Sequence, residues 1–252
     1  MSEPAKQQGH AEELRFPSTH WSSIFAANQP DPEQAKAALG RLLERYRQPL
    51  VAYLREKLHA DEEQARDWLQ SFVAEQVLQK EILRRVEPLE GKKFRSFLLC
   101  TLHHYVISQI RRDQSQKRLP EGGLISLETL EDWEAANVAD PAKAAYDLAW
   151  AHEVLTEALA QMESYCATEK RPDIWGVFDG RIRGPLLDGV APVPYDQLVE
   201  RYGLRSQIQA HNVKATGKRL LLRCLRAVIA EYAVDEKEVE AELLQLQQVF
   251  SR

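Results

Sequence analysis

Apolar residues recur at every third or fourth position along most of the chain, which is the spacing of one face of an α-helix. The first run spans residues 39–58. A second follows over residues 61–86 and opens on Asp61 and Gln64, a capping-box pattern. A third run, residues 94–112, alternates apolar positions with basic ones, and no stretch of the sequence shows the alternation of a strand. The pattern predicts an all-α fold.

The periodicity is lost over residues 119–147, where prolines and glycines stand among scattered acids, and it resumes near Leu148. We therefore expect two small helical domains joined by a linker. The expected parts are an N-terminal arm (1–38), a first domain (39–118), the linker (119–147), a second domain (148–232) and a C-terminal acidic helix (233–252) that opens on Asp235 and Glu238.

Within the second domain, residues 171–194 carry several prolines and glycines, which predicts an irregular connection. Pro194 suits the first turn of the helix that follows, and Gly203 suits its left-handed end. Ser206 can cap a further, basic helix. A helix, a short glycine-containing turn and a basic helix form the pattern of a helix-turn-helix.

The charge distribution is uneven, although the net charge is only −5. Residues 91–118 hold seven basic residues and one acid, and residues 201–226 hold seven basic residues and no acid. The rest of the chain is strongly acidic and would repel nucleic acid except at these two segments. Two local basic faces on an acidic protein predict selective contact with nucleic acid.

The remaining composition favours a reduced, cytoplasmic protein without catalytic chemistry. The three cysteines lie far apart, which predicts buried thiols and neither a disulfide nor a metal site. No signal peptide and no run of membrane-spanning length is seen in the sequence, so we expect no membrane association. The histidines and carboxylates match no metal or nucleophile motif, so we expect neither an enzyme nor a cofactor.

Three short motifs, in this order, are similar to those of extracytoplasmic-function (ECF) sigma factors, which belong to the sigma-70 superfamily. They are residues 16–22 (FPSTHWS), 64–73 (QARDWLQSFV) and 94–99 (FRSFLL). The resemblance covers about residues 39–232. It implies a protein that binds core RNA polymerase, directs promoter recognition, strand opening and transcription initiation, and catalyses no reaction itself.

The resemblance implies that the third helix reads the non-template strand of the minus-ten element. Unpaired bases need aromatic surfaces and hydrogen-bonding groups, and phosphates need cations. The implied DNA-binding residues are Lys92, Lys93, Arg95, His103, His104, Tyr105, Ser108, Arg111, Arg112, Lys117 and Arg118. We expect Arg95, both histidines and the Arg111–Arg112 pair to face outward. Alternatively, Tyr105 belongs to the core and the arginines merely face solvent.

The resemblance also implies that the second helix docks on the clamp helices of core RNA polymerase through Gln64, Asp67 and Gln70, and that the flap region of polymerase is a second contact. Alternatively, these side chains only solvate an amphipathic helix. Promoter DNA is the other implied partner. An anti-sigma factor or a regulatory kinase acting at Ser71 is a further candidate partner.

By the same resemblance, the basic helix of the second domain enters the major groove of the minus-thirty-five element. The implied contacts to bases and phosphates are Arg205, Ser206, Gln207, Gln209, His211, Asn212, Lys214, Lys218 and Arg219. Either the helix is rotated so that Ile208 and Ala210 face inward, or the module is degenerate and binds protein. A helix-turn-helix regulator that acts without polymerase and a sigma-like adaptor that binds only proteins remain the alternatives.

Overall fold

In the computed structural model, residues 32–79, 93–114, 133, 139–233 and 235–251 are described. Every regular element in these ranges is helical, which confirms the predicted all-α class. The elements are α2 (Pro32–Leu58), α3 (Glu62–Phe72), η1 (Val73–Gln79), α4 (Phe94–Gln114), α6 (Pro141–Thr168), α7 (Pro172–Phe178), η3 (Asp179–Asp188), α8 (Tyr195–Tyr202), α9 (Gln207–Ala230) and α10 (Glu236–Phe250). The segments η1 and η3 are π-helical.

The predicted helix starts follow from local capping. The Asp61 side chain accepts a hydrogen bond from the backbone N–H of Gln64 at 2.8 Å, and Asp235 accepts one from Glu238 at 2.8 Å. Each carboxylate satisfies an N–H group that the first helical turn leaves without a partner. Both predicted caps are confirmed. The predicted continuation over residues 80–86 lies outside the described residues.

Two predicted boundaries are wrong. Helix α6 begins at Pro141 rather than near Leu148, because Asp140 caps it and proline is well suited to a first helical turn. Helix α2 likewise begins at Pro32, ahead of the apolar run predicted to start at residue 39. The stretch expected to be irregular, residues 171–194, is largely helical, because α7 and η3 continue through it as far as Asp188.

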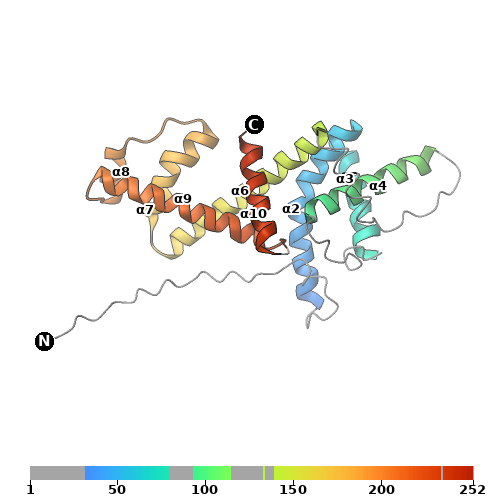
Figure 1. Ribbon diagram of the computed structural model, residues 1–252, viewed down its shortest axis with the longest axis horizontal. Helices are drawn as coiled ribbons and strands as arrows, with labels where there is room; N and C mark the ends of the chain where they lie inside the picture. The colour runs from blue at the N-terminus through green and yellow to red at the C-terminus, as the bar shows by residue number, and fades with distance from the viewer. Residues whose placement is uncertain (1–31, 80–92, 115–132, 134–138, 234, 252) are drawn as a thin grey trace.

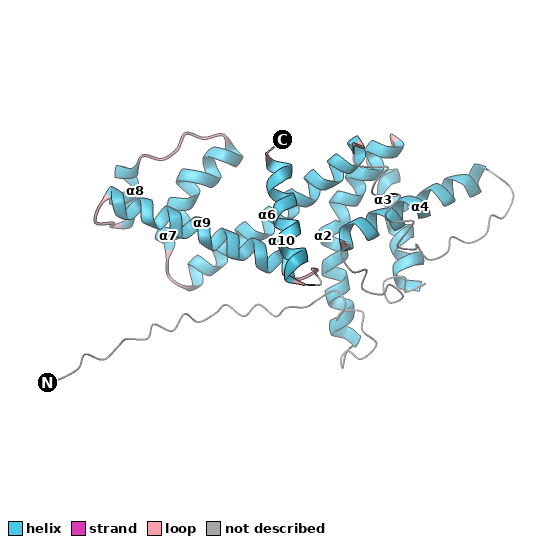
Figure 2. Ribbon diagram, viewed as in Figure 1, coloured by secondary structure: helices cyan, strands magenta, loops and turns pink. Residues whose placement is uncertain are grey.

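The long helix α6 joins the two ends of the molecule. Figures 1 and 2 show α2, α3 and α4 at one end and α7 and α8 at the other, with α10 between them. Helix α6 packs mainly against α2 and α9, and α10 packs against both α9 and α6. The helices from the two halves of the sequence therefore meet along α6.

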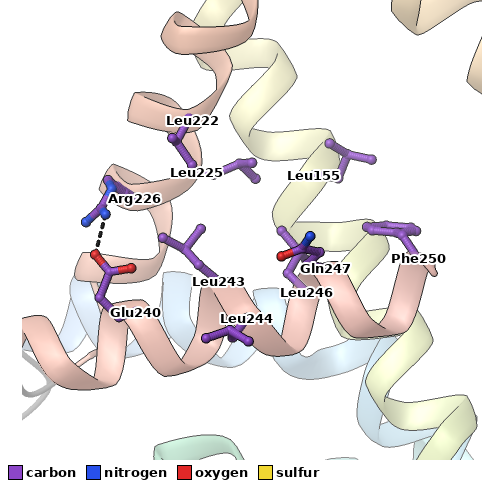
Figure 3. A pocket seen from close by; sticks show the side chains of 10 residues that line it. All are labelled: Leu155, Leu222, Leu225, Arg226, Glu240, Leu243, Leu244, Leu246, Gln247 and Phe250. Carbon is purple, nitrogen blue, oxygen red and sulfur yellow. Dashed lines mark hydrogen bonds and ion pairs between the residues drawn. The ribbon is translucent and has the colours of Figure 1, made fainter.

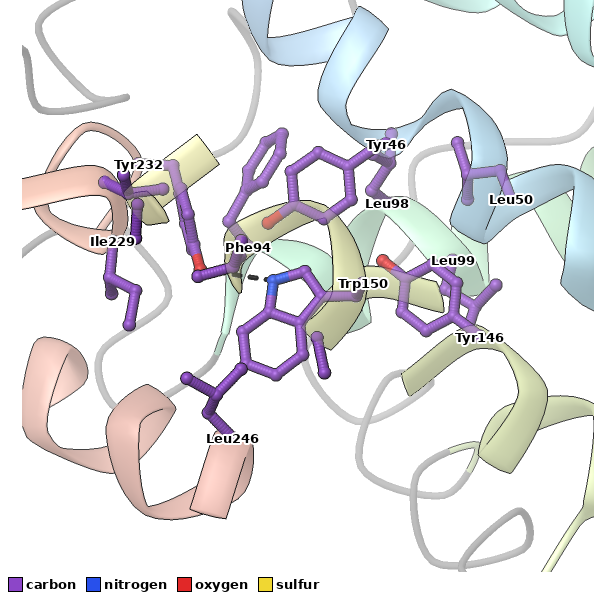
Figure 4. Packing of buried hydrophobic residues seen from close by; sticks show 14 of the residues in the cluster. Tyr46, Leu50, Phe94, Leu98, Leu99, Tyr146, Trp150, Ile229, Tyr232 and Leu246 are labelled. Carbon is purple, nitrogen blue, oxygen red and sulfur yellow. Dashed lines mark hydrogen bonds between the residues drawn. The ribbon is translucent and has the colours of Figure 1, made fainter. Parts of the chain in front are cut away.

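A cluster of aromatic side chains marks this meeting point (Figure 4). Tyr46 of α2 lies edge-on to Phe94 of α4, with ring centroids 5.6 Å apart, and to Tyr232, which follows α9, at 5.9 Å. The indole N–H of Trp150 on α6 donates to the Tyr232 hydroxyl at 3.2 Å. Because both halves contribute to one core, the predicted two-domain arrangement is not confirmed.

An ion-pair group also ties the halves together. The side chain of Arg45 on α2, only 8% exposed, pairs with Glu157 of α6 and with Glu231 at the end of α9, both at 2.7 Å. Two carboxylates balance one guanidinium that is largely withdrawn from water. The three cysteines are buried, as the sequence predicted. None of the described helices is both long and apolar enough to cross a membrane.

Candidate functional site

The N-terminal half of α4 lies inside the protein. Every residue from Phe94 to Leu102 is buried. Arg95, expected to face outward and bind DNA, has a side chain that is only 3% exposed. Its guanidinium pairs with Glu242 of α10 at 2.9 Å and with Asp147 of α6, and it lies 4.5 Å from the centre of the Trp150 indole. The prediction for Arg95 is wrong, because Asp147 of α6 and Glu242 of α10 pack against this side of α4.

Lys93 and His103, two further residues expected to bind DNA, also have their partners within the protein. The Lys93 ammonium lies 3.4 Å from a Glu242 carboxylate oxygen and donates to the backbone oxygen of Ala241. His103 was expected to face outward as well, but its Nδ1 shares a hydrogen bond of 2.8 Å with the Tyr53 hydroxyl, and its ring lies 6.3 Å from that of Trp133. The first basic segment is therefore partly neutralised by its own fold.

The environment of His103 predicts a pH-dependent stability. Burial, together with the nearby His104 and Lys57, lowers the pKa of His103 from 6.5 to about 4. The unfolded chain then takes up a proton at this site at a higher pH than the folded chain does. The stabilisation is complete above pH 6.5 and is lost as the pH falls toward 4.

We expect His103→Gln to reduce this loss of stability between pH 6.5 and 4. Urea unfolding of both proteins across that range measures it, and the difference between them removes the contribution of the carboxylates, which also titrate there. An identical pH dependence in the two proteins would contradict the assignment to His103.

The C-terminal half of α4 is the part that offers polar and basic side chains to solvent. His104 and Arg111 are exposed, whereas Ser108 and Arg112 are half-buried. Tyr105 is buried and packs against Phe72, with ring centroids 5.6 Å apart, as in the alternative that places it in the core. The predicted contacts Lys92, Lys117 and Arg118 lie outside the described residues.

Helix α3 presents all three predicted polymerase contacts on its outer side. Gln64, Asp67 and Gln70 are exposed, as is Ser71. Gln70 also lines a groove of about 500 Å³ between α2, α3 and η1, whose apolar floor includes Leu43 and Leu69. An apolar groove beside exposed acidic and amide side chains suits a protein partner better than a nucleic acid.

The turn between α8 and α9 has the geometry that its sequence predicted. Gly203 ends α8 in the left-handed conformation, with φ 60°. The Ser206 hydroxyl caps α9 by accepting from the backbone N–H of Gln209 at 3.2 Å. Pro194 stands just before the first turn of α8 rather than within it.

The first two turns of α9 leave several predicted contacts open to solvent. Exposed residues there are Arg205, Ser206, Gln207, His211 and Asn212, followed by Lys218 and Arg219 one to two turns later; Gln209 and Lys214 are half-buried. The inward stripe runs through Ala210, Val213 and Gly217. Ile208 is 74% exposed, so the alternative in which it faces inward is wrong for this residue and right for Ala210.

Gly217 explains how α9 approaches its neighbour. A Cβ atom at this position would lie 3.0 Å from the Cβ of Phe178 on α7, closer than side chains normally approach. The glycine in the middle of a long helix is therefore a close-packing residue. It brings α7 against the basic helix.

The cations of the second basic segment stay largely free of acids. Among the described residues, only Arg226 of the seven forms an ion pair, with Glu236 and Glu240. The six without one are Arg201, Arg205, Lys214, Lys218, Arg219 and Arg223. A helix with many unpaired cations and few nearby acids attracts polyanions. This segment, rather than α4, carries most of the described uncompensated positive charge.

Two features were not foreseen from the sequence. Arg181 of η3 and Tyr195 of α8 meet His211 and Lys214 of α9 in a cluster around the Tyr195 ring. An apolar groove of about 520 Å³ lies between α6, α9 and α10 (Figure 3), with Leu222, Leu244 and Phe250 among its lining residues. Neither feature has a local sequence signal, because each combines residues from separate helices.

In the parts of the chain that the structure describes, no three His, Cys, Asp or Glu side chains lie close enough to hold a metal ion. A scan against protein-family models matched no family. Searches of curated proteins and of solved structures found no significant match.

Proposed function

We propose that this chain is a promoter-specificity factor of the ECF sigma type, which binds core RNA polymerase, recognises promoter DNA and aids strand opening without catalysing a reaction. The observation that carries the proposal is the exposed leading face of α9, with its cap at Ser206 and its unpaired cations. A capped basic helix that follows a tight turn suits the major groove, where its first turns reach base edges.

The arrangement of α3 supports the polymerase part of the proposal. Asp67 and Gln70 stand on the exposed side of that helix beside an apolar groove. The outer end of α4, with His104 and Arg111, offers the polar and charged groups that a single strand requires. These two surfaces and α9 would contact polymerase, the minus-ten element and the minus-thirty-five element respectively.

Retention of core polymerase by the immobilised full chain tests the proposal. We expect the wild-type chain to retain it and Asp67→Arg to reduce the retained amount about tenfold, because an acidic contact becomes a repulsive one. Glu163→Arg, an equal charge change at an exposed position of α6, is the matched control and should have little effect. If the wild-type chain retains no polymerase, the sigma proposal fails.

A second candidate function is a DNA-binding regulator that acts without polymerase. The burial of Arg95 and the pairing of Lys93 with Glu242 favour it, since they remove two cations from the surface that would hold the minus-ten strand. Binding of duplex DNA without retention of polymerase would support this alternative. The adaptor alternative predicts that the chain binds neither, and the apolar groove of Figure 3 offers a surface for its protein partner.

A further inference from the structure

Three side chains, from η3 and α9, converge on the ring of Tyr195, the first residue of α8. The Arg181 guanidinium of η3 lies 4.2 Å from the ring centre, and the Lys214 ammonium of α9 lies 5.6 Å from it. The imidazole of His211 stacks on the same ring, with centroids 4.0 Å apart and planes 26° apart. Two cations thus share one aromatic platform beside the exposed first turns of α9.

The position of Arg181 is fixed by backbone contacts. Its Nη1 donates to the Val193 carbonyl at 3.0 Å, and the Val193 N–H donates to the Gly180 carbonyl at 2.9 Å. Gly180 lets this segment approach closely, since a Cβ there would lie 3.0 Å from the Val193 side chain. The guanidinium is therefore held in place before any ligand arrives, which lowers the entropic cost of binding.

The cluster has an excess of positive charge. Within the described ranges, neither Arg181 nor Lys214 forms an ion pair with a carboxylate. Burial raises the pKa of the Tyr195 phenol, but Lys214 and Arg181 more than offset this and leave the pKa below its ordinary value. This direction agrees with the two cations that lie beside the Tyr195 ring.

Arg183, which also belongs to η3, has carboxylate partners. Arg183 pairs with Asp179 and, at 3.1 Å, with Asp188. One arginine of this short segment is thus neutralised and the other is not, although they stand two positions apart. The unpaired one, Arg181, lies over the Tyr195 ring of α8.

We propose that Arg181 and Lys214, supported by Tyr195, form a binding site for one backbone phosphate of duplex DNA at the edge of the α9 contact surface. This inference rests on the proposed binding of duplex DNA by α9. A guanidinium donates charge-assisted hydrogen bonds to a phosphate, and a contact of this kind fixes how a protein is placed on the duplex. The site would set the register in which Gln207 and His211 meet the bases.

Duplex binding by Arg181→Gln tests the site, with Arg183→Gln as the matched control. A duplex selected from a random pool with the wild-type chain is the probe, and fluorescence anisotropy over a range of salt concentrations is the measurement. We expect Arg181→Gln to weaken binding about tenfold and to reduce the slope of log K against log salt by about 1. Arg183→Gln should change the affinity by less than about twofold.

Methylphosphonate substitutions, which neutralise one phosphate at a time, locate the contact. We expect one phosphate position at which neutralisation weakens duplex binding by the wild-type chain but does not change binding by Arg181→Gln, because that variant has already lost the interaction. Absence of any such position would overturn the proposal. So would displacement of the duplex by millimolar inorganic phosphate at constant ionic strength, which would indicate a site for the free anion.

The outcomes separate this inference from the proposed function. If the wild-type chain binds no duplex, DNA recognition by α9 and the phosphate site both fail. If it binds duplex but Arg181→Gln and Arg183→Gln behave alike, only the phosphate site fails. Circular dichroism of both variants establishes that a loss of binding is not a loss of fold.

Discussion

Replacing Arg95 with alanine is expected to lower the free energy of unfolding by about 3 kcal/mol, because the buried Asp147 and Glu242 would lose the guanidinium and keep only the partly exposed Lys143 and Lys93 as counter-charges. The side chains of Arg95, Asp147 and Glu242 are each less than a tenth exposed. Urea unfolding measures the change. A loss below about 1 kcal/mol would show that water reaches these carboxylates once the arginine is removed.

Arg226→Ala is the matched control for this prediction. Arg226 also pairs with two glutamates, Glu236 and Glu240, but all three side chains are substantially exposed. Exposed ion pairs contribute about 0 to 1 kcal/mol, so the control should be nearly neutral. The double variant Arg95→Met with Glu242→Leu should regain part of the stability lost in Arg95→Ala, since it removes one of the two buried carboxylates that pair with Arg95.

The Arg95 variant also separates a structural role from a DNA contact. Under conditions in which Arg95→Ala remains folded, its affinity for DNA should match that of the wild-type chain, because the buried guanidinium does not reach the surface. A selective loss of DNA binding in a folded variant would restore the original interpretation of this residue.

Replacing Gly217 with valine is expected to destabilise the protein by about 1 to 3 kcal/mol, because its side chain would collide with Phe178. The collision would push α7 away from α9. It would also displace η3, which carries Arg181, so duplex affinity should fall together with stability. Urea unfolding and fluorescence anisotropy measure the two effects, and a variant as stable as the wild type would contradict the close packing.

A second helical glycine provides the control. Gly40 of α2 has no other atom within 4 Å of the position of an added Cβ. Gly40→Ala should therefore stabilise the protein by about 0.5 to 1 kcal/mol through helix propensity alone. Gly217→Ala should show none of this gain, because the contact with Phe178 offsets it.

Helix α10 contacts both of the elements proposed to bind DNA. Glu242 of α10 holds Lys93 and Arg95 at the start of α4, while Arg226 on α9 is held by Glu236 and Glu240 of the same α10. The acidic C-terminal helix therefore connects the element proposed to hold the minus-ten strand with the element proposed to read the duplex. The spacing between the two would be set by this helix together with α6.

The helical class and the caps of the helices could be predicted from the sequence because they depend on residues a few positions apart. Asp61, Ser206 and Asp235 accept hydrogen bonds from N–H groups three residues later, and Gly203 ends α8 through its own backbone freedom. Such contacts form wherever the local chain is helical. The exposed residues at the start of α9 follow from the same local pattern.

Only the tertiary structure decided which basic side chains have an acidic partner and which do not. Arg95 looks like a surface residue of an amphipathic helix, but its partner Glu242 lies 147 positions away in the sequence. Arg181 looks like part of an irregular loop, yet it is placed against Lys214 through Tyr195. Whether a cation is neutralised depends on which distant helix covers it. Helical periodicity records which face of a helix is apolar and carries no information about the helix that packs against it.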